Sequence, residues 1–341
     1  KRRDENINLV WKYQEPDGII SSPALNRDKV CFVTYGGTVV FLDLKTGKKL
    51  WKKEIGSSVV VPPFLCDDRI MIPACDSIVY ALSAEDGAVI WQRKLDSPGT
   101  GAVSGDSLNI YLGDGNGSLY CLTQEDGSVI WVCRDGEEYT ESSPVLTETE
   151  VYYSAWDGYL RCLNRGNGDL VWKWKSDKEN FLFSPAACEP FITDKCICVV
   201  TPERAVYGIH RITGKTVWKS KEHKARESIG GIKGGSVFYV RCMEDTLCAY
   251  EAEQESGAGK LLWASKIGFG YDINPASPVV YQDMVIFTTH DGSIYFVSRN
   301  DGQLIKEIKL SENQLHKPII TDDGKYLCVS CMDGFVFLVR I

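Results

Sequence analysis

A glycine followed four residues later by a tryptophan occurs six times along this chain and limits its fold more than any other feature. The six pairs are Gly47/Trp51, Gly87/Trp91, Gly127/Trp131, Gly168/Trp172, Gly214/Trp218 and Gly259/Trp263. Gly302 and Lys306 keep the spacing without the tryptophan, and Trp11 lies one period before the first pair. The period is about 40 to 46 residues, the repeat length of a four-stranded β-propeller blade. Because such repeats stack into one body, we expect a single propeller domain over residues 1–341.

Short apolar runs separated by turns predict four strands in each repeat. In the first repeat these runs cover residues 21–25, 30–34, 38–43 and 50–53, with a Gly-Gly hairpin between the second and the third. Inner strands are expected near Pro23, Pro62, Ala102, Pro144, Pro185, Gly230, Pro278 and Pro318. We therefore predict an all-β, eight-bladed β-propeller of four-stranded antiparallel blades. Seven blades is the alternative, if one weak repeat is misread.

The eighth repeat lacks an outer strand of its own, because its third apolar run, 335–341, ends the sequence. Residues 7–12 have the composition of a spare outer strand. Pairing them with the last run would close the ring and remove two exposed strand edges.

Two repeats depart from the pattern. The sixth carries extra polar sequence around residues 255–258, which we expect to project as a loop. The fifth has no hairpin glycine near Glu203 and Arg204.

Composition excludes several classes of protein. The net charge is −8 from 38 basic and 46 acidic residues, without long blocks of one sign, so we expect no nucleic-acid partner. No apolar run approaches the roughly 18 residues of a membrane span. The 13 cysteines lie mostly in apolar strands, which indicates buried free thiols rather than a disulfide framework.

The repeat tryptophans are interpreted as structural. One per blade, each can cover a turn and pack between blades while its indole N–H bonds to the backbone. They are Trp11, Trp51, Trp91, Trp131, Trp172, Trp218 and Trp263. Trp156 differs, because it precedes a hairpin glycine, and we expect it near an exposed face.

Residues 42–51 (LDLKTGKKLW) and 81–91 (ALSAEDGAVIW) resemble the tryptophan-docking motif of quinoprotein-type propellers with PQQ-like repeats. That superfamily includes pyrroloquinoline-quinone (PQQ) dehydrogenases and the lipoprotein scaffold of the bacterial outer-membrane β-barrel assembly machinery. It also includes propellers appended to larger enzymes, such as metallophosphoesterases and acyl-activating enzymes. The resemblance implies a scaffold, a PQQ-binding oxidoreductase or sensor, or the C-terminal domain of a larger enzyme. It implies a bacterial periplasmic or envelope location, whereas the cysteines favour the cytoplasm.

The sequence contains no recognisable catalytic or metal-binding constellation. The resemblance implies a vicinal cysteine pair over the quinone in the dehydrogenases, and this chain has no adjacent cysteines. Cys328 and Cys331 form a C-x-x-C on a predicted strand, where residues three apart face opposite sides. We therefore predict no catalytic residues, no metal and no cofactor, with PQQ implied only by the resemblance.

One face of the ring is the predicted working surface. Loops before the inner strands and hairpins between the second and third strands emerge together there, and aromatic and arginine side chains are typical contact anchors. The candidates are Tyr35, Tyr139, Trp156, Arg204, Arg226, Tyr271, Asp272, His290 and Met332. We predict a non-catalytic, monomeric scaffold or regulatory module that binds a protein or peptide there.

Overall fold

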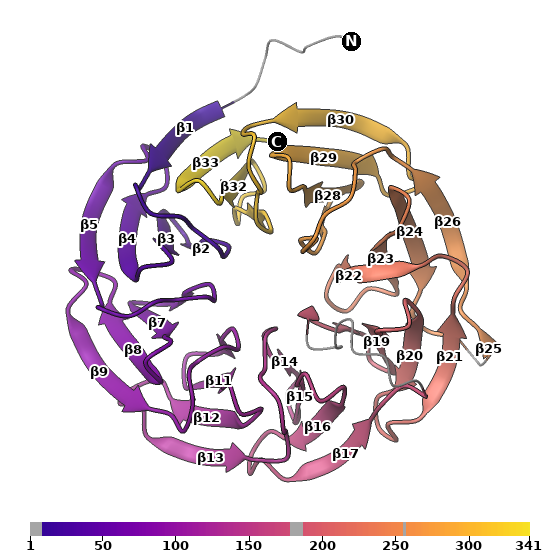
Figure 1. The fold of residues 1–341 in the computed structure, drawn as a ribbon, viewed down its shortest axis with the longest axis horizontal. Coiled ribbons are helices and arrows are strands. Elements are labelled where there is room, and N and C mark those ends of the chain that lie inside the picture. The colour runs from indigo at the N-terminus through magenta and orange to yellow at the C-terminus, as the bar shows by residue number, and fades with distance from the viewer. Residues whose placement is uncertain (1–8, 178–186, 255–256) are drawn as a thin grey trace.

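The computed structural model describes residues 9–177, 187–254 and 257–341, which form eight β-sheets arranged as blades around a central axis. Figure 1 shows the closed ring, with the chain passing from blade to blade in sequence order. The prediction of an eight-bladed propeller is confirmed, and the seven-bladed alternative is excluded.

The first four blades have regular strands of similar length. Blade 1 contains β2 (Ala24–Asn26), β3 (Lys29–Val33), β4 (Thr38–Asp43) and β5 (Lys49–Glu54). Blade 2 contains β6 (Phe64–Cys66), β7 (Arg69–Pro73), β8 (Ile78–Ser83) and β9 (Val89–Lys94). Blade 3 contains β10 (Ser104–Gly105), β11 (Asn109–Gly113), β12 (Leu119–Thr123) and β13 (Val129–Cys133). Blade 4 contains β14 (Val145–Leu146), β15 (Glu150–Ser154), β16 (Leu160–Asn164) and β17 (Leu170–Trp174).

The last four blades are less uniform. Blade 5 contains β18 (Phe191–Ile192), β19 (Cys196–Val200), β20 (Val206–His210), β21 (Thr216–Ser220) and the added β25 (Gly257–Ala258). Blade 6 contains β22 (Ala225–Gly231), β23 (Val237–Cys242), β24 (Thr246–Glu251) and β26 (Leu261–Lys266). Blade 7 contains β27 (Val279–Tyr281), β28 (Met284–Thr288), β29 (Ser293–Ser298) and β30 (Leu304–Lys309). Blade 8 contains β31 (Ile319–Ile320), β32 (Tyr326–Ser330), β33 (Phe335–Arg340) and β1 (Leu9–Gln14).

The N-terminal strand closes the ring as predicted. β1 pairs antiparallel with β33, with Lys12 opposite Phe337, and becomes the outer strand of blade 8. Two side chains of blade 8 also bond to the segment between β1 and β2: Ser330 Oγ donates to the Ser21 carbonyl at 2.7 Å, and His316 Nε2 lies 2.7 Å from the Ile19 carbonyl. The two ends of the chain are therefore held together by side chains as well as by strand pairing.

The core lies between blades rather than at the axis. Second and third strands are buried along most of their length, whereas outer strands alternate between exposed and partly buried residues. Side chains of adjacent blades pack together, as Phe41 of blade 1 does in a cluster with Ile70 and Leu82 of blade 2. Each blade thus buries its apolar faces only against its two neighbours.

Each repeat tryptophan contacts the blade after its own. Trp91 Nε1 donates to the Gln124 carbonyl at 3.0 Å, and its ring lies against Gly127 in the next turn. The seven acceptors are the carbonyls of Leu44, Ala84, Gln124, Arg165, Arg211, Ala252 and Arg299, for Trp11, Trp51, Trp91, Trp131, Trp172, Trp218 and Trp263 in that order. Lys306 occupies the eighth position, facing blade 8. That blade takes its outer strand from the N-terminal segment, so it has no turn there for a tryptophan to cover.

The irregular repeats differ from the sequence predictions. The prediction of a projecting loop around residues 255–258 is wrong for residues 257–258. These two residues form β25, which pairs in parallel with β21 of blade 5. Residues 255–256 lie outside the described residues. So does Pro185, where an inner strand was expected, and the inner strand of blade 5 is β18. In the hairpin without glycine, Arg204 itself adopts a positive φ of 62°.

The cysteines are all unpaired, and only Cys66 and Cys75 are not fully buried. Cys328 packs between blades 8 and 1, whereas Cys331 packs between blades 7 and 8, so the C-x-x-C side chains face opposite sides of their blade. In the described part of the chain, no helix is long and apolar enough to span a membrane.

Candidate functional site

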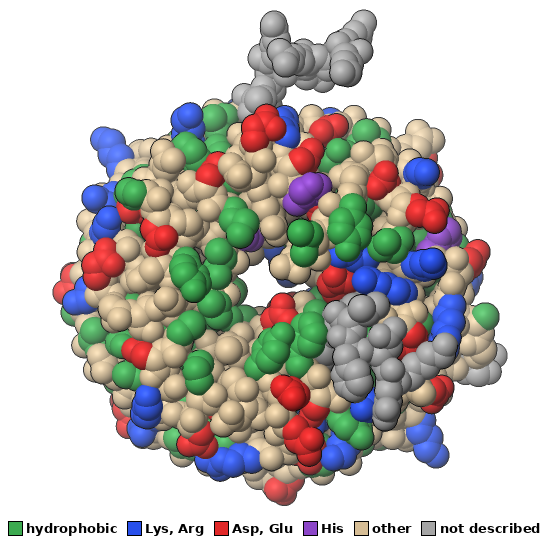
Figure 2. All heavy atoms as spheres, in the orientation of Figure 1, with side chains coloured by type: hydrophobic (Ala, Val, Ile, Leu, Met, Phe, Trp, Pro, Cys, Tyr) green, Lys and Arg blue, Asp and Glu red, His purple; other side chains and the backbone are tan. Residues whose placement is uncertain are grey.

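The hairpins between second and third strands emerge on the face seen in Figure 2, together with the loops between blades. We call it the hairpin face. One residue of each hairpin, the second after the second strand (the first in blade 6), occupies an equivalent place: Tyr35, Cys75, Gly115, Trp156, Pro202, Met243, His290 and Met332. In six of them the backbone N–H bonds to a carbonyl of the preceding loop at 2.8–2.9 Å, and in His290 it bonds to the Asp272 carboxylate. The six bonds to carbonyls involve only backbone atoms, so they do not occupy the side chains at these positions.

The hairpin face carries apolar side chains around the mouth of a central channel (Figure 2). Tyr35 and Met332, on blades 1 and 8, are 50% and 49% exposed. Gly18 lies between them: its carbonyl accepts the Tyr35 N–H at 2.8 Å, and its Cα faces the Met332 carbonyl. Two predicted contact residues are therefore neighbours although they lie almost 300 residues apart in the sequence.

An aromatic pair marks blade 4. The rings of Tyr139 and Trp156 stack with centroids 5.2 Å apart and planes at 17°. Trp156 Nε1 donates to Glu141 Oε2 at 2.9 Å, and Trp156 N–H donates to the Tyr139 carbonyl. The pair is fixed in orientation: Tyr139 is 39% exposed, whereas Trp156 is half-buried and packs against the core cluster of blades 5 and 6.

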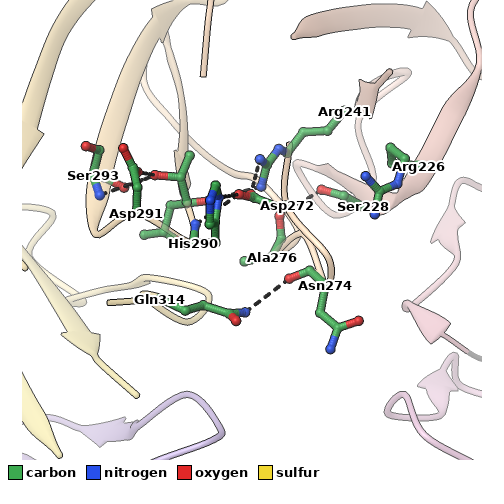
Figure 3. Close-up of polar contacts among 12 residues, drawn as sticks. Arg226, Ser228, Arg241, Asp272, Asn274, Ala276, His290, Asp291, Ser293 and Gln314 are labelled. Atoms are coloured by element: carbon green, nitrogen blue, oxygen red, sulfur yellow. Dashed lines mark hydrogen bonds and ion pairs between the residues drawn. The ribbon is translucent and has the colours of Figure 1, made fainter. Parts of the chain in front are cut away.

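A buried charge network joins blades 6 and 7 (Figure 3). The Asp272 carboxylate pairs with the guanidinium of Arg241, from β23, and with Nδ1 of His290 at 2.5 Å. Arg241 also donates to the Thr288 carbonyl at 3.0 Å, and its guanidinium lies over the rings of both Phe269 and Phe287. Arg241 is 1% and Asp272 3% exposed, so each supplies the counter-charge that the other needs in the interior.

A second ion-pair network lies beside the first, on the side of blade 5. Glu227 accepts hydrogen bonds from Arg226 Nη2 at 2.8 Å and from Arg204 Nη1 at 2.9 Å. Arg226 also bonds to the Ile273 carbonyl at 3.0 Å and lies under the Tyr271 ring. Burial raises the pKa of Glu227, but the hydrogen bonds and charges of the two arginines outweigh it and hold the pKa below its ordinary value.

The Asp272–His290 pair has limited catalytic potential. The carboxylate orients the imidazole through Nδ1 and leaves Nε2 toward solvent, as in a general base. Within the described residues, however, the His290 ring bonds to no serine, threonine or cysteine side chain. The pair therefore lacks the nucleophile of a triad and serves to position an exposed imidazole.

The structure divides the nine predicted contact residues into two kinds. Tyr35, Tyr139, Trp156, Arg204, Tyr271, His290 and Met332 present at least part of their side chains to solvent. Arg226 and Asp272 are 4% and 3% exposed and position their neighbours instead. Sequence reasoning missed Arg241, Glu141 and Glu227. An arginine inside the apolar run 237–242 was the available signal for Arg241, whereas the two glutamates sit in segments with no distinguishing pattern.

The pocket inside the ring does not fit PQQ. It lies between blades 2 to 8, has a volume of about 540 Å³ and is lined mainly by backbone and small or apolar side chains of the inner strands and the residues beside them. Its charged groups are Lys233, Lys317 and Glu189, and Lys317 already lies 3.9 Å from Glu189. The described residues hold no group of three or more His, Cys, Asp or Glu side chains placed to bind a metal ion. A quinone with several carboxylates and a calcium ion would need more cations and more oxygen ligands than this lining offers.

Solved structures share the fold along nearly the whole chain. BamB from Moraxella catarrhalis is 16% identical with a TM-score of 0.77, over 98% of this chain and 97% of its own. Sqt1 from Saccharomyces cerevisiae is 10% identical with a TM-score of 0.81, over 98% and 99%. Quinohemoprotein alcohol dehydrogenase from Comamonas testosteroni is 12% identical with a TM-score of 0.75, over 97% and 76%. At these identities the likeness concerns the fold alone.

Family membership rests on the sequence itself. No curated protein matches the chain. A family model does match, in three overlapping segments that cover residues 6–114, 75–226 and 202–314. The chain therefore belongs to the family described as outer membrane protein assembly factor BamB and carries its PQQ-like repeat β-propeller.

Proposed function

We propose that this chain is a non-catalytic scaffold or regulatory module whose hairpin face binds a protein or peptide. The observation that carries the proposal is the ring of equivalent hairpin positions, five of which hold a large side chain that is at least partly open to solvent: Tyr35, Trp156, Met243, His290 and Met332. Tyr, Trp, Met and Arg at such positions are typical of binding hot spots. We further propose that residues 1–341 act as one propeller domain and as a monomer.

The scaffold role is supported against its two alternatives. A PQQ-binding oxidoreductase or sensor would need a lining that holds the quinone, and the residues of the pocket inside the ring do not fit it. A propeller appended to a larger enzyme would use the same face for its neighbouring domain, so this alternative changes the partner and not the surface.

Site-specific photo-crosslinking tests the face. A photoreactive amino acid at Tyr35 or Met332 is expected to capture one partner, whereas the same group at Leu108, 72% exposed on the opposite face, captures none. With that partner purified, Tyr35→Ala/Met332→Ala should weaken binding about tenfold or more, and Leu108→Ala less than about twofold.

Three results would count against the proposal. They are equal capture of the partner from positions on both faces, an unchanged affinity of the Tyr35→Ala/Met332→Ala variant for that partner, and turnover of a substrate by the isolated chain. Calorimetric titration with PQQ, with and without calcium, completes the test, since saturable binding would favour the oxidoreductase alternative.

A further inference from the structure

The carboxylate of Glu141, in the loop before β14, has no cationic partner among the residues that the structure describes. It accepts a hydrogen bond from the Trp156 indole N–H at 2.9 Å, and no lysine, arginine or histidine of the described residues forms an ion pair with it. Nearby carboxylates are paired differently: Glu227 is held by two arginines, and Asp272 is held by Arg241. Glu141 therefore differs from these two carboxylates in that no described cation compensates its charge.

The surroundings of Glu141 make that charge unfavourable in the free protein. Although the residue is solvent-exposed, the protein around it desolvates the carboxyl group and raises its pKa. The Trp156 hydrogen bond offsets part of this effect, and the negative charge of Glu227 adds to it. The same loop carries Glu137 and Glu138, both exposed. A cation bound at Glu141 would relieve this repulsion.

The aromatic pair beside Glu141 supplies a complementary surface. Tyr139 and Trp156 stack at 5.2 Å, and their hydrogen bonds hold them at the edge of the carboxylate. An ammonium or guanidinium group over an aromatic face is attracted by the ring quadrupole, and more strongly where it is partly desolvated. Carboxylate and aromatic faces together select a basic side chain over a neutral or acidic one.

We propose that Glu141, Tyr139 and Trp156 form a specific site for a lysine or arginine side chain of the partner segment that docks on the hairpin face. The inference rests on the proposed protein-binding function and names the chemistry of its partner at blade 4. A metal ion is the poorer occupant, because the described residues around Glu141 offer no set of three ligating side chains.

The test follows the Trp156 indole N–H signal in spectra of ¹⁵N-labelled full-length protein, assigned with Trp156→Phe. The probes are trilysine, triarginine and triglutamate peptides with blocked ends. We expect the two basic peptides to shift this signal saturably and triglutamate to leave it unmoved. Glu141→Gln should weaken the response about tenfold, whereas Glu137→Gln, on the same loop but without the aromatic contact, should weaken it less than about twofold. A larger response to triarginine than to trilysine would assign the site to a stacking guanidinium, and the reverse would assign it to an ammonium.

Equal effects of Glu141→Gln and Glu137→Gln would overturn the inference, since they would show a diffuse field rather than a site. A response to triglutamate, or none to either basic peptide, would overturn it as well. If Glu141→Gln fails to fold, Tyr139→Leu tests the aromatic face and leaves the Glu141 charge intact. Unchanged binding of the basic peptides to Tyr139→Leu would contradict the site. Capture of a partner through Tyr35 and Met332 without any response at Trp156 would reject this inference while sustaining the proposed function.

Discussion

At the scale of single residues, the glycine and the tryptophan of a repeat act on different blades. The tryptophan covers the turn of the following blade, as Trp91 covers Gly127, and donates its indole N–H to a carbonyl of that blade. A side chain built on Gly127 would bring its Cβ within 2.6 Å of the Trp91 ring. The turn glycine is thus required both by its positive φ of 70° and by the close approach of the ring.

Gly127→Ala separates these two requirements when it is compared with Gly56→Ala. Both glycines have a positive φ, 70° and 77°, but a Cβ at Gly56 would meet no atom within 4 Å. We expect Gly127→Ala to lower the free energy of unfolding by about 1–3 kcal/mol more than Gly56→Ala does, because only the former displaces a tryptophan. Urea denaturation of the two variants measures the difference. Equal losses would mean that backbone strain alone keeps glycine in the turn.

At the scale of elements, loops from different blades are joined by side chains that a strand pattern does not reveal. His316, in the loop before β31, bonds to the Ile19 carbonyl in the segment after β1, and its own carbonyl accepts the Thr288 hydroxyl of β28. Burial lowers the pKa of His316, and the hydrogen bond to Ile19 only partly opposes this. The closure between blades 8 and 1 therefore depends on a neutral imidazole.

Stability should fall in mild acid for this reason. The unfolded chain binds a proton at His316 near the ordinary histidine pKa of about 6.5, whereas the folded protein resists it until lower pH. The contribution of His316 is thus complete above that pH and is lost as the pH falls below it. Between pH 7.5 and 5.5 we expect wild type to lose about 1 kcal/mol more unfolding free energy than His316→Gln. Urea titrations of both proteins at the two pH values measure it, and parallel losses would contradict the assignment.

At the scale of the whole molecule, the ring is held closed by one strand from the far end of the chain. β1 supplies the outer edge of blade 8, and Trp11 on it docks onto Leu44 of blade 1. Without β1, the β33 edge and the side of blade 1 would be exposed together. An open β edge is also a site for association with other chains.

Deletion of residues 1–14 should therefore destabilise the protein by at least about 3 kcal/mol and promote association. Appending residues 9–14 after Ile341 through a short turn should restore stability. The appended strand would then follow β33 as a hairpin and pair antiparallel with it, as β1 does. Thermal unfolding and size-exclusion chromatography report the two effects. A deletion variant that unfolds like wild type would show that closure by β1 contributes little.

Much of the fold could be predicted from sequence because the repeat is local. A period of about 40 residues with a glycine turn and a tryptophan specifies one blade, and counting inner strands gives eight blades. The fold prediction was wrong where a segment of one repeat pairs with another blade. Residues 257–258 belong to blade 5 because their backbone pairs with the outer edge of β21. Nothing in their own sequence indicates this pairing.

The hairpin face was only partly predictable for the same reason. Hairpin position alone identified Tyr35, Trp156, His290 and Met332 as outward-facing candidates, although not which of them lie together. Arg241 is 31 residues from Asp272, and Glu141 is 15 residues from Trp156. Pairs this far apart are set by the packing of blades and not by a local pattern.

The sequence by itself determined the blade, its number of copies and the lack of a disulfide framework, because each follows from the identity or spacing of residues within a repeat. It also indicated the N-terminal closure, because the eighth repeat lacks an outer strand and the N-terminal segment has the composition of one. Only the tertiary structure decided which charges are paired, which hairpin residues are neighbours, and that no described cation pairs with Glu141. Those properties depend on distances between blades, which arise when the ring closes and the loops of different repeats come within hydrogen-bonding reach.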